Sequence, residues 1–328
     1  MLKLIYLQEN FDLARTALAH WPHDEATLDA RLARFRISAN AVYPFDCGGK
    51  LCFLRLTPAD ETSSPMLREE LRLIHRLRAE GYPALEPLPS IQGEEIVTLH
   101  TPWGIWYASA FAAVPGKPIE DTEMTEEVLF RYGETLGEMH RINMEYLPAP
   151  TRPNFLQKMQ WIKQQMEDAP TPLFRECDVV EQELSQLWRG PYTLGMVHGD
   201  FEPDNVFWDG ANCHVIDFND CMIHFYALDV VIALDELPPE AHAAFLRGYR
   251  AACPHSGVKE EDFPLMRRFK QLHQYARILH ALSKRPDPEP DWMPDLVTKL
   301  RGIMQGIEAQ ILAERRQRRR NRLYMEKK

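Results

Sequence analysis

Three polar side chains beside one predicted hairpin could act together on a phosphate group. Short apolar runs on either side of an Asp-Gly turn predict a β-hairpin within residues 206–218. Asp200 and Asn205 precede its first strand, and Asp217 lies at the end of its second strand. The hairpin therefore places two carboxylates and one amide within reach of a common point.

Phosphoryl transfer is the reaction that requires such a set of side chains. One carboxylate orients a hydroxyl nucleophile and receives its proton, while an amide oxygen and a second carboxylate hold Mg²⁺ against the nucleotide phosphates. Mg²⁺ prefers hard oxygen ligands and takes only a few of them from the protein. We therefore expect Asp200, Asn205 and Asp217 to carry this chemistry.

The order and spacing of these residues also resemble a known family. The sequence His-Gly-Asp at 198–200, then Asn205, then Ile-Asp-Phe at 216–218 is similar to the motifs of one phosphotransferase superfamily. That superfamily contains aminoglycoside phosphotransferases, choline kinases and homoserine kinases, and its members share the protein-kinase-like fold. Each residue alone is an ordinary loop residue, so the resemblance depends on the ordered set.

The resemblance implies a role for each residue and a pair of cofactors. It makes Asp200 the catalytic base, Asn205 and Asp217 the metal ligands, and His198 a structural residue that braces the loop. It also implies ATP and Mg²⁺ as cofactors, with the γ-phosphoryl group passing to a hydroxyl of a small molecule.

The length and composition of the chain suit a globular enzyme. The 328 residues contain enough apolar side chains for one large or two medium domains. No run of about 18 apolar residues is present, so we expect no membrane-spanning segment. The first ten residues lack a small-residue cleavage site, and the six cysteines form no CxxC pair. These features predict a reduced cytoplasmic protein.

The net charge of −10 hides an asymmetry along the chain. Residues 1–313 contain 30 basic and 46 acidic side chains, whereas the tail from Glu314 onward is basic. An acidic body argues against nucleic acid as a partner and is compatible with a cationic acceptor. The basic run 315–322 is either an interaction arm or, as we favour, the solvated end of a helix.

The first third of the chain predicts an antiparallel sheet with helices around it. Residues 9–34 have the apolar period of helices, and strands are expected at 36–45 and 51–56 around a Gly-rich turn. The segment 38–43 resembles the stretch that covers the phosphates in the family, which makes Asn40 a candidate nucleotide-binding residue. It lacks the paired glycines of a protein-kinase loop, and an ordinary edge strand is the alternative.

Arg55 occupies the position where the family usually carries a phosphate-binding lysine. Lys50 is the nearest lysine, but an offset of five residues along a strand places it on the opposite face. Arginine offers a planar, permanently charged fork that suits phosphate and carboxylate. The helix expected at 65–80 supplies its partner, Glu70, with Glu69 as the alternative.

Two further strands, at 95–100 and 103–112, complete a predicted sheet of about five strands. The chain then leaves the sheet through a segment that resembles the connector between lobes in the family. In that connector, backbone groups bind the adenine edge, so Phe111 and Ala113 are candidate nucleotide-binding residues. The boundary between lobes is placed after residue 112.

The rest of the chain is predicted to be mostly helical. His140 and Asp229 match structural residues of the family, and Asp229 is expected to cap backbone near the catalytic loop. In the helix at 125–141, Gly133 and Gly137 mark where another helix presses close. Further helices are expected near the segments 155–167, 179–188, 239–252, 260–283 and 291–320, with Trp161 and Trp188 in the core.

The sequence therefore predicts an α+β, two-lobed protein-kinase-like fold. Residues 1–112 form the nucleotide-binding lobe, and residues 113–328 form a mostly helical catalytic and substrate lobe. The expected activity is ATP-dependent phosphorylation of a small-molecule hydroxyl, such as that of an aminoglycoside or amino alcohol. A Ser/Thr protein kinase and, because of Arg55, a non-catalytic nucleotide-binding scaffold are the alternatives.

The acceptor itself leaves little trace in the sequence. Asp220, Asp235 and Glu236 lie close in sequence to the expected metal ligands and could attract an amine. They are also ordinary polar residues near a loop, so both interpretations remain open.

Overall fold

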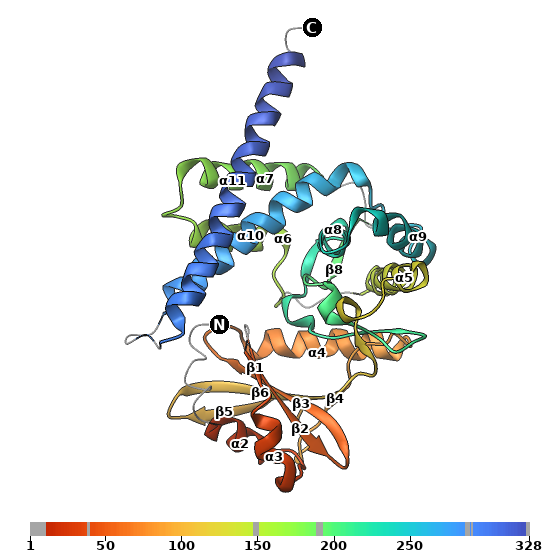
Figure 1. The fold of residues 1–328 in the computed structure, drawn as a ribbon, viewed down its shortest axis with the longest axis vertical. Coiled ribbons are helices and arrows are strands. Elements are labelled where there is room, and N and C mark those ends of the chain that lie inside the picture. The colour runs from red at the N-terminus through yellow and green to blue at the C-terminus, as the bar shows by residue number, and fades with distance from the viewer. Residues whose placement is uncertain are drawn as a thin grey trace.

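The protein has two lobes: a small lobe built on an antiparallel sheet and a larger lobe made mostly of helices (Figure 1). This computed structural model describes residues 11–37, 40–146, 151–187, 193–285, 289 and 291–325. The α+β, two-lobed arrangement that the sequence predicts is confirmed. The last strand of the small lobe ends at Ala112. The division into residues 1–112 and 113–328 stays a prediction.

The small lobe is organised around a six-stranded antiparallel sheet. Its strands are β1 (Arg36–Ile37), β2 (Ala41–Cys47), β3 (Lys50–Pro58), β4 (Pro87–Leu88), β5 (Val97–Thr101) and β6 (Gly104–Ala112). The order is β1-β2-β3-β6-β4, and β5 also pairs with β6. The sheet has more strands than predicted because the expected strand at 36–45 is divided into β1 and β2, and β4 is too short for a sequence pattern.

Strand β3 places Arg55 at the centre of this sheet. Arg55 lies opposite Val42 of β2 and Ser109 of β6. Because side chains alternate along a strand, its neighbours Leu54 and Leu56 point to the other face and are fully buried there. The guanidinium group of Arg55 therefore faces the larger lobe. The family resemblance implies this direction for a residue that binds the nucleotide phosphates.

Two helices cover the sheet face that is turned away from the larger lobe (Figure 1). They are α2 (Asp12–Leu18) and α3 (Glu25–Leu32), which confirms the helices expected within residues 9–34. Asp24 caps α3 by accepting a hydrogen bond from the backbone N–H of Ala26. Apolar side chains of both helices form one core cluster with Leu54 and Leu56.

Helix α4 (Ser64–Ala79) lies between the sheet and the larger lobe (Figure 1). Ser63 caps it by accepting from the backbone N–H of Met66, and Pro65 stands in its first turn, where a missing N–H costs nothing. Four of its buried side chains belong to the core of the larger lobe rather than to that of the small lobe, namely Leu71, Leu73, Ile74 and Leu77. The helix thus connects the two lobes.

The larger lobe is assembled from helices around two small sheets. The helices are α5 (Glu126–Asn143), α6 (Phe155–Gln165), α7 (Thr171–Gln186), α8 (Ala227–Asp235), α9 (His242–Ala252), α10 (Phe263–Ser283) and α11 (Met293–Met325). The strands are β7 (Lys117–Pro118), β8 (Leu194–Val197), β9 (Val206–Trp208), β10 (Cys213–Val215) and β11 (Met222–Phe225). Short 3₁₀ turns cover Ile119–Asp121, Pro203–Asn205, Phe218–Asp220, Pro239–Ala241 and Glu260–Asp262.

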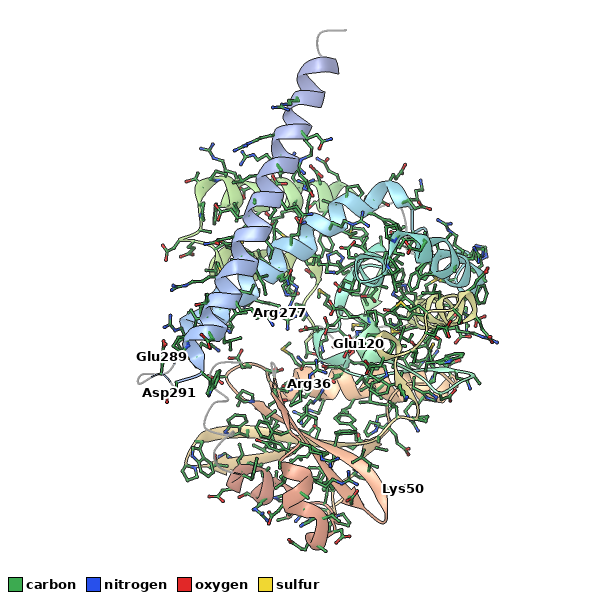
Figure 2. The ribbon with its side chains drawn as sticks, in the orientation of Figure 1. Arg36, Lys50, Glu120, Arg277, Glu289 and Asp291 are labelled. Carbon is green, nitrogen blue, oxygen red and sulfur yellow. The ribbon has the colours of Figure 1, made fainter. Side chains whose placement is uncertain are left out.

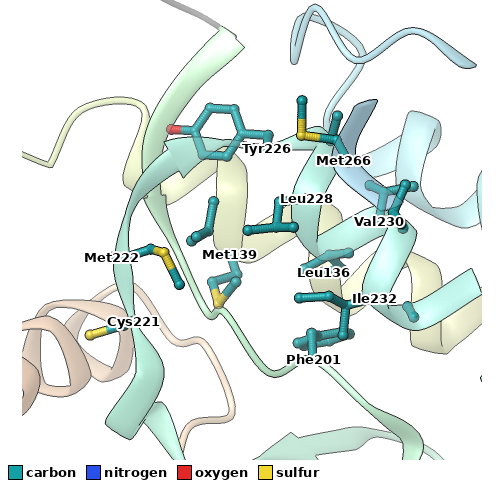
Figure 3. Packing of buried hydrophobic residues seen from close by; sticks show 14 of the residues in the cluster. Leu136, Met139, Phe201, Cys221, Met222, Tyr226, Leu228, Val230, Ile232 and Met266 are labelled. Carbon is teal, nitrogen blue, oxygen red and sulfur yellow. The ribbon is translucent and has the colours of Figure 1, made fainter. Parts of the chain in front are cut away.

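A continuous apolar core lies directly beneath the loops that carry the predicted chemistry. Helix α8 is apolar nearly all round and is buried, which is the pattern of a central core helix. Its Leu228 and Ile232 pack near Leu136 and Met139 of α5 and the ring of Phe201 (Figure 3). The loop that contains Phe201 is therefore anchored from below.

Several predicted helix boundaries are corrected by local geometry. Helices α9 and α10 begin three residues later than predicted because their first residues form 3₁₀ turns. Helix α7 begins at Thr171, eight residues before the predicted start at 179. Pro172 stands in the first turn of α7, a position that proline favours, and this signal was available in the sequence.

The basic C-terminal helix α11 extends beyond the body of the molecule (Figure 1). Arg318 forms an ion pair with the buried Glu176 of α7, and Arg315 donates to the carbonyl oxygen of Pro172. The expectation that this end is simply solvated is therefore wrong for Arg315 and Arg318. These contacts attach α11 to α7.

None of the helices in the described ranges combines the length and the apolar content that crossing a bilayer requires.

Helices α5 and α9 approach each other at the glycines that the sequence singles out. A Cβ atom at Gly133 would collide with the carbonyl oxygen of Phe245, and one at Gly137 would lie 2.6 Å from that of Tyr249. On the facing helix, a Cβ at Gly248 would collide with the carbonyl oxygen of Phe130. The predicted close contact is confirmed, and α9 is the partner.

Gly133→Ala should lower the free energy of unfolding by about 1–3 kcal/mol, because a methyl group there forces two helix backbones apart. Gly302→Ala on α11 is the matched control, since that position faces open space. It should be neutral or stabilising, by up to about 1 kcal/mol, through helix propensity. Urea denaturation of both variants measures the difference, and equal stabilities would contradict the packing argument.

Candidate active site

The loop 198–205 leads from β8 to β9, and Asp217 stands between β10 and β11. Strands β8 and β11 pair with each other, while β9 pairs with both β10 and β7. The loop and Asp217 are thus held between two small sheets. This arrangement brings Asp200, Asn205 and Asp217 to one region, as the hairpin pattern predicts.

Asp217 has a strained backbone. Its φ and ψ angles are 59° and 62°, and among the described residues other than glycine it is the one with positive φ. A left-handed conformation at a non-glycine residue costs free energy and persists where the surrounding structure fixes it, often at functional sites. The strain therefore marks Asp217 as a positioned side chain.

A buried network braces the catalytic loop from behind. Asp229 accepts hydrogen bonds from the backbone N–H groups of His198 (2.7 Å) and Gly199 (2.8 Å). His140 contacts the same carboxylate through Nε2 at 3.0 Å and the hydroxyl of Tyr249 through Nδ1 at 3.0 Å. The capping role expected for Asp229 and the buried bracing role expected for His140 are both observed.

Asp200 and Asn205 are in direct contact. The side-chain amide of Asn205 donates to the carboxylate of Asp200 (3.1 Å) and to its backbone carbonyl (2.9 Å). Burial raises the pKa of Asp200 to about 7, and the carboxylates of Asp220 and Asp217 add to this rise against the opposing charge of Arg277. The site therefore concentrates negative charge around Asp200.

The donor set fits a divalent cation shared with a nucleotide. The amide nitrogen of Asn205 is directed to Asp200, which leaves its side-chain oxygen available as a hard ligand. The backbone N–H of Ile216, the residue before Asp217, donates to the backbone carbonyl of Asn205 at 3.0 Å. Burial raises the pKa of Asp217 although Arg55 opposes the rise, so a nearby cation would relieve the cost of ionising it. No group of three or more His, Cys, Asp or Glu side chains in the described ranges could hold a metal alone. Phosphate oxygens would complete the coordination.

Arg55 and Glu70 form a bidentate buried ion pair. The two guanidinium nitrogens lie 2.6 and 3.1 Å from the carboxylate oxygens. Arg152, from the segment before α6, reaches the same carboxylate at 3.4 Å and donates to the carbonyl oxygen of Asn219 at 2.7 Å. The side chains of Arg55, Glu70 and Arg152 are at most 7% exposed.

The alternative partner of Arg55, Glu69, is engaged elsewhere. It accepts from the hydroxyl of Tyr146 at 2.8 Å and pairs with Arg72 at 3.2 Å. The two neighbouring glutamates of α4 therefore face different partners, and Glu70 is the one that faces β3.

The other residues predicted to bind the nucleotide are Asn40, Phe111 and Ala113. They lie on the small lobe or where the chain leaves it. Asn40 is buried and lines the same cavity as Asp200. The guanidinium of Arg55 lies 5.0 Å from the centre of the Phe111 ring. The backbone N–H of Ala113 donates to Leu51 at 3.1 Å, so this group is occupied within the protein. A hydrogen bond to the edge of an adenine would therefore have to involve the carbonyl oxygen of Ala113 or a neighbouring backbone group instead.

A cavity of about 740 Å³ opens beside Asp200. Its walls come from the small lobe and from α6, α8, α10 and α11. Arg277 lies on α10 where that helix faces the small lobe (Figure 2). Glu61 of the small lobe contacts Lys284 and, at 3.1 Å, His280 of α10, which joins the lobes beside this cavity. The cavity is large enough for a small-molecule acceptor.

The acidic residues that could attract an amine all have basic partners. The pairs are Asp220 with Arg277 at 2.8 Å, Asp235 with Arg267 at 2.7 Å and Glu236 with Lys270 at 3.3 Å. They therefore do not provide the free negative charge that the sequence suggests. Glu202 also lines the cavity, and burial together with the charge of Asp200 raises the pKa of Glu202 to about 7.

Trp161 and Arg152 show where sequence reasoning misses functional side chains. Trp161 is predicted to be core; it is half-buried and packs against the core, and it also lines the cavity. Its neighbour one turn back, Lys158, lines the cavity as well, and its ammonium lies 5.6 Å from the Trp161 ring centre. Spacing of three residues on one helix face was the available signal. Arg152 stands in a segment interrupted by prolines, where no sequence pattern indicates its contact with Glu70. Trp188, also predicted to be core, lies outside the described residues.

Glu70→Ala should destabilise the protein more than Arg55→Ala. The first change leaves two buried guanidinium groups without their shared carboxylate, at a cost of about 3–5 kcal/mol, whereas the second leaves Glu70 paired with Arg152. Urea denaturation measures both. Glu69→Ala is the control on the same helix and should cost less, because its partner Arg72 is 54% exposed. A larger loss for Arg55→Ala would contradict this assignment.

Comparison with known proteins places this geometry in a family. A family model described as the phosphotransferase enzyme family matches residues 39–259. The amicoumacin kinase of Bacillus subtilis (strain 168) is 23% identical over 227 residues, covering 65% of this chain and 68% of that protein. The homoserine kinase of Caulobacter vibrioides (strain NA1000 / CB15N) is 25% identical over 261 residues, covering 68% of this chain and 80% of that one.

The fold agrees with that of a solved kinase. The amicoumacin kinase hAmiN, solved in complex with AMP-PNP, Ca²⁺ and Ami, has a TM-score of 0.74 at 19% identity, covering 94% of this chain and 96% of that one. The predicted protein-kinase-like fold is confirmed. Because the family model covers more than half of the residues and the catalytic motifs fall within it, this chain belongs to the phosphotransferase enzyme family.

Proposed function

We propose that this protein transfers the γ-phosphoryl group of ATP, in the presence of Mg²⁺, to a hydroxyl group of a small molecule. The observation that carries the proposal is the placement of Asp200 between Asn205, which it contacts at 3.1 Å, and the cavity of about 740 Å³. A base between a metal-binding amide and an acceptor cavity is the arrangement that phosphoryl transfer to a hydroxyl needs.

Residues of both lobes would hold the nucleotide. Asn205 and Asp217 would bind Mg²⁺, which neutralises charge on the phosphates when it is bound. Arg55 would contact the phosphates, because its buried Nε–H has no partner among the described residues and remains available as a donor. Asn40 and the backbone near Phe111 and Ala113 complete the proposed site. The AMP-PNP and Ca²⁺ in the hAmiN complex support a nucleotide and a divalent metal.

Asp200 would orient the acceptor hydroxyl and accept its proton. Its raised pKa makes it a better proton acceptor than an ordinary aspartate, and Asn205 fixes the orientation of its carboxylate. Most of the catalysis would come from positioning and electrostatics, since the protein does little covalent work in such transfers.

A small-molecule acceptor is favoured over the alternatives. The relatives named for their acceptors, amicoumacin kinase and homoserine kinase, support small hydroxyl compounds as a class. The intact pair of Arg55 with Glu70 argues against a non-catalytic scaffold, because the arginine retains the partner that a catalytic lobe provides for the lysine of this family. No observation on the described surface favours a protein substrate.

Asp200→Asn should reduce phosphoryl transfer by at least 10²–10⁴-fold, as is typical when a positioned acid–base group is lost, and leave Mg-ATP binding largely intact. Single-turnover transfer from labelled ATP and calorimetric titration of the nucleotide measure the two effects. Asp204→Asn in the same loop is the control, because Asp204 pairs with the exposed Arg36. Unchanged turnover of Asp200→Asn would refute its role as the base.

Asn205→Ala and Asp217→Ala should weaken nucleotide binding in Mg²⁺ and have much less effect in EDTA. The reason is that both side chains would act on the nucleotide through the metal. Calorimetric titration with ATP in the two conditions measures this, with Asp204→Ala as control. An equal loss in both conditions would mean that the residues act on folding or contact the nucleotide directly.

A further inference from the structure

Almost all the Lys and Arg side chains that line the cavity beside Asp200 contact a carboxylate of the protein itself. In the described part of the chain, four of these five cations each have a carboxylate partner within 4 Å: Arg152 with Glu70, Lys270 with Glu236, Arg277 with Asp220 and Lys284 with Glu61. The fifth cation is Lys158, which has no such partner among these residues. Among the described residues that line the cavity, Lys158 is therefore the one Lys or Arg side chain without a carboxylate contact.

The surroundings of Lys158 destabilise its positive charge when no anion is bound beside it. Its ammonium lies 5.6 Å from the centre of the Trp161 ring, and both side chains line the cavity. Burial lowers the pKa of Lys158, and the positive charges of Arg277 and Arg152 lower it further against the opposing effect of Asp220. A partly desolvated ammonium beside other cations is stabilised when an anion joins it.

The rigid position of Lys158 suits it to recognise a ligand. Asn154 and Gln157 form a capping box that fixes the start of α6, one turn before Lys158. Trp161 follows one turn later on the same face and restricts the lysine stem. The position of the ammonium is therefore set before any ligand arrives.

The carboxylate that acts most strongly on Lys158 is engaged by another basic side chain. It belongs to Asp220, and it lies 2.8 Å from Arg277. Asp200 and Glu202 also line the cavity, but neither is among the charges that chiefly shift the pKa of Lys158. At Lys158 itself, a cationic group would meet an ammonium without a carboxylate contact, whereas an anionic group would find a partner.

We propose that the hydroxyl acceptor carries a carboxylate, which pairs with Lys158 over the Trp161 ring while its hydroxyl faces Asp200. Lys158 is then a specificity-determining residue rather than a catalytic one. The inference rests on the proposed function, because it takes the cavity as the acceptor site. The proposed acceptor is thus an acid that contains a hydroxyl group, rather than the cationic compound that the acidic composition suggests.

The test begins with the natural acceptor. The purified full-length protein is incubated with Mg²⁺, [γ-³²P]ATP and a bacterial metabolite extract, and the labelled products are separated and identified by mass spectrometry. The principal acceptor should contain a carboxylate. Its methyl amide, which keeps the hydroxyl and removes the charge, should show a kcat/KM reduced by at least about tenfold.

Variants then connect the carboxylate to the lysine. Lys158→Met should raise the KM for the acid by at least about tenfold, with kcat and the KM for ATP changed little. For the methyl amide, the variant and the unchanged protein should have similar KM values. Lys163→Met on the same helix is the control, since Lys163 pairs with Asp178 and Glu181 and does not line the cavity. It should leave all constants unchanged.

Three results would overturn the inference, and they are distinguishable. A neutral or cationic principal acceptor would contradict the carboxylate. A rise in the KM for ATP in Lys158→Met, with the acceptor KM unchanged, would assign the lysine to the nucleotide phosphates instead. Labelling of no metabolite at all by protein that binds Mg-ATP would defeat the proposed function, and the inference with it.

Discussion

The structure depends on one buried carboxylate that holds two arginines. Glu70 of α4 binds Arg55 of the sheet at 2.6 Å and Arg152 of the larger lobe at 3.4 Å. Removing such charges from water is expensive, and the geometry must repay this cost with good hydrogen bonds. The position of α4 is therefore fixed by electrostatics as well as by its apolar face. Side chains of both lobes therefore meet at Glu70.

A second buried constraint controls the shape of the loop 198–205, which carries the proposed catalytic base. The carboxylate of Asp229 accepts hydrogen bonds from two backbone N–H groups of the loop and contacts the imidazole of His140. These hydrogen bonds to the charged form, led by that of His140, outweigh burial and lower the pKa of Asp229. The loop keeps its shape through groups that lie behind it, so its front face stays free for chemistry. Strain at Asp217 is tolerated because both sides of that residue are held by paired strands.

The sequence predicts proximity best for residues that are close together in the chain. Asp200, Asn205 and Asp217 lie within 18 residues, and the turn between them has a recognisable pattern. The choice between Glu69 and Glu70 could not be made from the sequence, because one residue on a helix changes the direction of a side chain by about 100°. That direction is set by how α4 packs between the lobes.

Long-range contacts explain the other misses. Arg152 is 82 residues from Glu70, and no local pattern announces a contact over that distance. Trp161 was assigned to the core because large aromatic residues usually are, whereas here the helix presents its ring at the edge of a cavity. The amide of Ala113 is occupied by Leu51 of the neighbouring strand, a detail that only the paired backbone shows.

One part of the cavity wall comes from a segment that the family model does not cover. The family model ends at residue 259, before α10 and α11, which contribute Arg277, Leu300 and Ile303 to the cavity. The residues predicted for the chemistry lie within the shared segment, together with the walls from the small lobe, α6 and α8. Substitutions in α10 and α11 can therefore reshape the cavity and leave the segment that defines the family unaltered.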